Sequence, residues 1–152
     1  MRIAFVALAL TAAACAPQPP HEDAAPSTAA ANGAVAAPTP SDVSIRITAA
    51  QNGQTVQVPV NQRFAVELVG VPTAGYVWTP AQLPAFITRA GDVTGNTTQA
   101  QSQPGFAGGN HWEVLMFSAT GPGTGDIVIE QRRPWETNSP AADTFRVTIV
   151  AQ

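Results

Sequence analysis

Val43-Ser44-Ile45-Arg46-Ile47-Thr48 alternates apolar and polar side chains with a period of two. Such alternation is typical of a β-strand that buries one face and exposes the other. The Asn52-Gly53 pair that follows is a strong signal for a hairpin turn. The folded part of the chain is therefore expected to begin near residue 42 and to be built from strands.

The same alternation returns in short segments through the rest of the chain. Strands are predicted around residues 56–60, 64–68, 76–78, 111–119, 127–130 and 144–149. Pro59 indicates an edge strand, Thr79-Pro80 is expected to end the segment at 76–78, and residues 83–89 fit a strand or one helical turn. Residues 93–109 are polar and rich in Gly, Gln and Thr, which predicts a long connection.

This pattern gives seven or eight short strands without a convincing helix. It predicts an all-β fold, an immunoglobulin-like antiparallel β-sandwich, with a small closed barrel as the alternative. The chain has a single cysteine, so the sandwich must be stable without a disulfide.

The N-terminus has the features of an export signal. Residues 1–14 combine a positive Met1-Arg2 start, an apolar stretch and a small-residue cleavage site directly before Cys15. Residues 10–15 resemble a bacterial lipoprotein signal, which implies lipidation of Cys15, whereas ordinary cleavage after Ala14 is the alternative. We expect an exported protein that is membrane-anchored and faces the periplasm or the cell exterior.

Residues 15–41 are dominated by Ala, Pro, Thr and Ser, with few apolar side chains larger than Ala. Such a segment gains too little from burial to offset its ordering entropy. We expect a disordered tether over residues 15–41 and one folded domain over residues 42–152.

Composition and side-chain chemistry exclude several classes of function. Every basic side chain is an arginine and the formal net charge is −3, so nucleic-acid binding has no electrostatic basis. His111 has no Ser or Cys partner nearby in the sequence, and the carboxylates are scattered singly. The spacing of ligand-type residues predicts neither a metal site nor a cofactor. We therefore expect a protein that is not an enzyme.

Three turn-rich segments instead carry the candidate functional residues, at 71–78, 105–109 and 132–136. Each combines Pro or Gly with an aromatic side chain, and each occupies an alternate connection between predicted strands. Alternate connections of an up-and-down sandwich lie at the same end. Aromatic and Arg side chains on stiff loops are typical of a surface that binds another protein.

These three segments together resemble the chagasin-type inhibitors of papain-like cysteine proteases. The first reads Val-Pro-Thr-Ala-Gly-Tyr, the second Gly-Phe-Ala-Gly-Gly and the third Arg-Pro-Trp, in the family's order. The resemblance implies an immunoglobulin-like domain that acts as a monomer and inserts three loops into the protease cleft as a wedge. Val71 stands where the family carries Asn, and Ala74 where it carries a second Thr.

The resemblance also implies which residues bind. Thr73 is expected to lie closest to the protease nucleophile, and Phe106 is either a further contact or an anchor of its own loop. The predicted protease-binding residues are Val71, Pro72, Thr73, Ala74, Gly75, Tyr76, Phe106, Gly108, Gly109, Arg133, Pro134 and Trp135. The competing interpretation is an immunoglobulin-like envelope lipoprotein that binds another protein or a glycan through the same loops.

Overall fold

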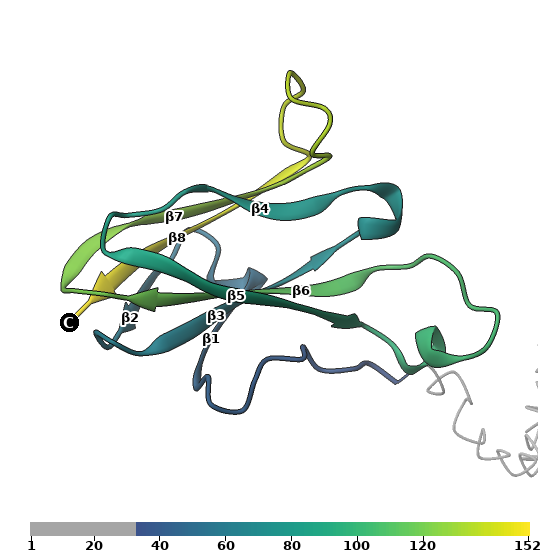
Figure 1. The fold of residues 1–152 in the computed structure, drawn as a ribbon, viewed down its shortest axis with the longest axis horizontal. Helices are drawn as coiled ribbons and strands as arrows, with labels where there is room; N and C mark the ends of the chain where they lie inside the picture. Colours follow the sequence, from purple (N-terminus) through teal and green to yellow (C-terminus); the bar gives the residue numbers. More distant parts are fainter. Residues whose placement is uncertain (1–32) are drawn as a thin grey trace, which may run out of the picture.

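Two β-sheets of four strands each pack face to face in the structure, a computed structural model that describes residues 33–152 (Figure 1). In spatial order, the first sheet contains β1 (Ile45–Thr48), β3 (Arg63–Gly70), β6 (His111–Ala119) and β5 (Ile87–Asn96). The second sheet contains β2 (Thr55–Val58), β8 (Asp143–Ala151), β7 (Gly123–Arg132) and β4 (Val77–Gln82). Short 3₁₀ helices lie in the connections: η2 (Ala49–Gln51), η3 (Pro72–Ala74) and η4 (Gln99–Ser102). The predicted all-β sandwich is confirmed.

Most neighbouring strands run antiparallel, but the short edge strands β1 and β2 pair in parallel with β3 and β8. The hairpin expected at Asn52-Gly53 is therefore wrong, because β1 and β2 belong to different sheets. The turn instead attaches to β8: Gly53 N donates to Arg146 O over 2.7 Å, and Asn52 Oδ1 accepts from Arg146 N over 2.9 Å. The turn residues therefore mark a crossing from one sheet to the other.

The main core lies between the two sheets and consists of the inward side chains of the alternating strands. The rings of Phe64 and Phe117 lie 5.7 Å apart at its centre, and both side chains are fully buried. The other fully buried members include Ile47, Val66, Ile127, Ile129, Val147 and Ile149. Burial of this apolar area is the main favourable contribution to folding.

A second, smaller core lies on the outer face of the first sheet, where residues 33–43 cross the strands. We call residues 33–43 the strap; Figure 1 shows it in dark blue, running beneath β3 and β6 toward β1. Its Ala37 and Val43 pack with buried side chains of the sheet, namely Ala65, Val114 and Met116. The prediction of a disordered tether is wrong for residues 33–41, because Ala37 and Thr39 are buried. An Ala- and Pro-rich segment becomes ordered here because β6 is apolar on both faces and needs a cover.

Two strand boundaries also differ from the predictions. β4 continues through Pro80, which is tolerated because β4 is an edge strand that pairs only with β7. β5 extends over ten residues into the segment expected to be a connection, with a register shift at Gly91, whose φ is +116°. A glycine tolerates this positive φ, so the strand continues past the irregularity.

The predicted signal segment (residues 1–14), Cys15 and residues 16–32 of the predicted tether lie outside the described residues. Within residues 33–152, no helix is long and apolar enough to cross a membrane.

The central ring pair provides a test of the fold. Phe117→Ala should lower the free energy of unfolding by about 3–5 kcal/mol, because it leaves a cavity among fully buried side chains. Thr124→Ala, an exposed position on β7, should change it by less than about 0.5 kcal/mol. Urea denaturation of both variants measures the difference. Equal effects would contradict the placement of Phe117 at the centre of the core.

Candidate functional site

The three turn-rich segments lie at one end of the sandwich. Loop 1 (residues 71–76) joins β3 to β4, loop 2 (residues 97–110) joins β5 to β6, and loop 3 (residues 133–142) joins β7 to β8. His111 pairs with both Gly70 and Asn96, so loops 1 and 2 leave from neighbouring strand ends. Loop 1 is central because it crosses from the first sheet to the second (Figure 1).

Loop 1 is a tight turn whose backbone is stabilised from within. Val71 O accepts hydrogen bonds from Ala74 N over 2.9 Å and from Tyr76 N over 3.2 Å, and Pro72 O accepts one from Gly75 N over 2.9 Å. Gly75 has a φ of +83°, a left-handed conformation that favours glycine. The side chain of Thr73 is exposed at the tip. These backbone bonds brace the loop although Val71 has no polar side chain.

Arg133 of loop 3 holds loop 1 in place. Its Nε donates to Ala74 O over 3.0 Å, and its guanidinium lies 4.5 Å from the centre of the Tyr76 ring. The hydrogen bond from Nη1 to Glu136 Oε1, 2.9 Å long, raises the pKa of Arg133 above its ordinary value. The guanidinium is therefore a permanent cation that joins loops 1 and 3.

Trp135 covers the outer side of the same junction. Its indole lies against Gly75, where an added Cβ would overlap the ring, yet 68% of the residue remains exposed. Gly75 is thus required both for its positive φ and for the close approach of the indole. The result is an exposed ridge formed by loop 1 and Trp135.

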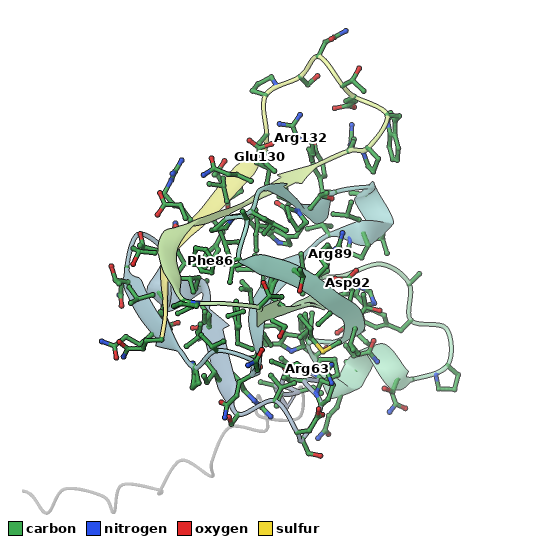
Figure 2. The ribbon with its side chains drawn as sticks, turned by 60° about the vertical axis from the view of Figure 1, so that its left-hand side comes forward. Arg63, Phe86, Arg89, Asp92, Glu130 and Arg132 are labelled. Carbon is green, nitrogen blue, oxygen red and sulfur yellow. The ribbon has the colours of Figure 1, made fainter. Side chains whose placement is uncertain are left out.

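The stem of loop 3 is fixed by a second ion pair. Figure 2 shows Glu130 and Arg132 together at the base of the loop, and Arg132 Nη2 lies 2.5 Å from Glu130 Oε2. Arg132 Nη1 also donates to Ser139 O over 3.4 Å, from the other side of the loop. The ion pair orients Arg132 on β7, and the bond from Arg132 to Ser139 O attaches the far side of loop 3 to that strand.

Loop 2 is organised around Gln101, a residue that was not among the predicted site residues. Gln101 Oε1 accepts from the backbone of Thr97 and Thr98 over 2.7 and 2.9 Å, and its Nε2 donates to Asn110 O over 2.7 Å. The signal in the sequence was the Thr98-x-x-Gln101 spacing of a capping box. One side chain therefore closes the loop across its stem.

The tip of loop 2 contains the predicted Phe106, Gly108 and Gly109. Both glycines have positive φ, +80° and +92°, and the ring of Phe106 lies near Gly109. Phe106 is nevertheless 46% exposed, so it contacts its own loop and still presents part of its ring. Among the described residues, no hydrogen bond joins loop 2 to loop 1 or loop 3.

Below the loops, a buried carboxylate connects the two sheets. Glu113 on β6 is 8% exposed, and its Oε2 accepts a 2.9 Å hydrogen bond from the backbone N of Trp78 on β4. An added Cβ at Gly70 would overlap this carboxylate, and Oε1 has no hydrogen-bond partner within the described part of the chain. Sequence reasoning missed Glu113 because an isolated acid in a strand carries no motif.

Burial is the main reason that the pKa of Glu113 is raised above its ordinary value of 4.5. The charge of Asp92 raises it further, whereas the Trp78 N–H and the charge of His111 lower it. Trp78 itself is buried, and its indole N donates to Val69 O over 3.0 Å. Trp78 and Glu113 together fix the strand ends from which loop 1 departs.

Comparison with known proteins identifies the family. Residues 57–149 match the sequence pattern of the family described as "Chagasin family peptidase inhibitor I42". The chain belongs to the chagasin family. The prediction of an inhibitor rather than an enzyme is thereby confirmed at the level of the family.

Among residues 33–152, no cluster of three metal-ligating side chains occurs.

Two solved structures have a similar fold. The cysteine protease inhibitor EhICP2 from Entamoeba histolytica is 18% identical, with a TM-score of 0.60 over 71% of this chain and 95% of that one. The solution structure of amebosin is 25% identical, with a TM-score of 0.56 over 71% of this chain and 97% of that one. No curated protein matches the chain significantly.

The buried carboxylate predicts a pH dependence of stability. Because the folded-state pKa of Glu113 lies above its unfolded value, the folded state binds more protons between the two. The contribution of Glu113 to the free energy of unfolding should therefore decrease as the pH rises from about 4.5 through the raised pKa. Glu113→Gln should remove this component, since the amide does not titrate.

Urea denaturation of wild type and Glu113→Gln at several pH values from 4.5 to 7.5 measures this effect. The stability of wild type relative to the variant should be greatest at the acidic end and fall toward neutral pH. A difference that stays constant over this range would contradict a burial-raised pKa.

Proposed function

We propose that this chagasin-family domain is a reversible, tight-binding inhibitor of papain-like cysteine proteases. The observation that carries the proposal is the single ridge that loops 1 and 3 form through Arg133 and Trp135, with Thr73 at its tip. Family membership supports the same function. Loop 1 enters the active-site cleft at its centre, and loops 2 and 3 contact the two walls.

The stiffness of the ridge favours tight binding. Pro72 and Pro134 have fixed φ angles, and Arg133 holds loop 1 before any partner arrives. Little backbone entropy is then lost on docking, so more of the contact energy contributes to affinity. Trp135 contributes the large, mostly exposed aromatic surface typical of an interface hot spot.

Internal hydrogen bonding also explains how loop 1 would resist cleavage. The carbonyl oxygens of Val71, Pro72 and Ala74 all accept hydrogen bonds within the loops. The turn cannot extend as a strand-like substrate without breaking these bonds. Thr73 therefore occupies the position nearest the nucleophile without becoming a substrate.

We further propose that the domain acts as a monomer tethered to a membrane through a lipid on Cys15. Support comes from the sequence alone: a positive start, an apolar stretch and small residues directly before the cysteine. The protein would then act in the periplasm or outside the cell.

Titration of papain and cathepsin L with residues 16–152 tests the proposed function. Trp135→Ala should weaken inhibition about 30-fold, equivalent to about 2 kcal/mol, because it removes a hot-spot side chain. Thr73→Arg should weaken it by a similar factor or more, because a long charged side chain cannot fit against the nucleophile. Both positions are exposed, so the Tm should change little.

Thr124→Arg is the matched control for Thr73→Arg. It adds the same side chain at an exposed position near the start of β7, at the opposite end of the sandwich. Its inhibition constant should equal that of wild type. No inhibition by the wild-type protein at micromolar concentration would refute the proposed function and favour an envelope module with another partner.

A further inference from the structure

The N-terminal end of the strap lies beside loop 2. Val35 N donates to Thr97 O over 2.9 Å, and Gln99 N donates to Gly33 O over 3.1 Å. Ala34 forms an antiparallel bridge with Thr98 between these two bonds. The first residues of the strap thus pair with the N-terminal stem of loop 2 as a short added strand.

β6 anchors the same point from the other stem of loop 2. The indole N of Trp112 donates to Val35 O over 2.7 Å, so Val35 is held through both its N–H and its carbonyl. Trp112 follows His111 directly at the start of β6, where loop 2 ends. The strap therefore connects the two stems of loop 2 through one residue.

Farther along, the strap is fixed firmly to the sheet. Thr39 Oγ1 donates to the buried Glu67 carboxylate, and Arg63 Nη1 pairs with Asp42 Oδ2 over 2.8 Å. Pro38 packs so closely on Gly95 of β5 that an added Cβ there would lie 2.9 Å from the proline ring. Figure 2 shows Arg63 on the opposite side of the molecule from loop 3. These contacts attach the strap to the first sheet from Pro38 to Asp42.

Loop 2 needs such support more than the other loops. It contains glycines with positive φ at 105, 108 and 109, and no hydrogen bond ties it to loops 1 and 3 among the described residues. A glycine-rich loop loses much conformational entropy when it is ordered on binding. Gln101 closes the loop by accepting hydrogen bonds from the backbone of Thr97 and Thr98. The strap pairs with these same two residues.

We propose that the strap is a positioning element of the inhibitory surface, which holds loop 2 in its binding conformation before a protease arrives. The matched family region begins at residue 57, so the strap lies outside the matched residues. The proposal rests on the proposed function, because it assigns loop 2 to the protease contact. Loss of the strap bonds should leave loops 1 and 3 unchanged and raise the dissociation rate of the complex.

Val35→Pro in residues 16–152 tests this role, because it removes the N–H that bonds to Thr97 O. Ala36→Pro is the matched control: Ala36 is exposed, and its N–H donates no hydrogen bond within the described residues. Trp112→Phe is a second variant that removes the donor to Val35 O and keeps an aromatic ring. Amide hydrogen exchange and the dissociation rate from papain are measured for all three proteins and wild type.

The expected result is exchange at Gln99 and Gln101 that is about tenfold faster in Val35→Pro and Trp112→Phe, with several-fold faster dissociation from papain. The Ala74 amide in loop 1 should exchange as in wild type, and Ala36→Pro should match wild type throughout. Unchanged exchange in both test variants would overturn the proposal. Faster exchange without faster dissociation would also overturn it, since the strap would then be merely structural.

Failure of the proposed function gives a separate signature. If the wild-type protein does not inhibit the protease, the proposed function is wrong and loop 2 has no assigned protease contact. The exchange rates at Gln99 and Gln101 then decide alone whether the strap holds the loop.

Discussion

The Arg133 guanidinium is the interaction on which the functional surface depends. It donates to the carbonyl of Ala74 and lies over Tyr76, so a turn from one connection is fixed by a side chain from another. Glu136 keeps the guanidinium oriented, and Trp135 covers the glycine next to the bonded carbonyl. Two separate loops thereby become one ridge. Because the cation is used internally, the exposed part of this ridge is formed by Thr73 and the outer face of Trp135.

The ridge is only as rigid as the strand ends that carry it. Trp78 fills the gap between the sheets directly behind loop 1, and its two N–H groups donate to Val69 O and to the Glu113 carboxylate. These bonds link β4 of the second sheet to β3 and β6 of the first. A buried acid is costly unless it is hydrogen-bonded, and here it receives one such bond. Burial of the Glu113 carboxylate lowers the free energy of unfolding. Its hydrogen bond with Trp78 N, however, fixes the spacing between the sheets at the loop end.

The strap supports loop 2 in a comparable way. It covers the outer face of the first sheet and pairs with the stem of the glycine-rich loop. The segment N-terminal to the domain therefore joins it at the end that carries the three loops.

The sequence predicted the strands and the grouping of the loops because both depend on local patterns. Alternation with a period of two marks a half-buried strand, and alternate connections share an end whatever the side chains are. The strap escaped prediction because Ala and Pro carry no alternation, and its burial depends on a distant strand. A signal was nevertheless present, since Trp112, Val114 and Met116 make the outer face of β6 apolar. The inward role of Arg133 and the burial of Glu113 depend on contacts across the sandwich, which no local pattern encodes.

The proposed function requires the loop ridge to enter the protease cleft. Isothermal titration of residues 16–152 into papain with a free active site, and into papain whose cleft holds a covalently attached peptide inhibitor, measures whether it does. Insertion of the ridge predicts tight one-to-one binding to the free enzyme and no measurable binding to the blocked one. Equal binding to both enzymes would place the contact outside the cleft and contradict the wedge.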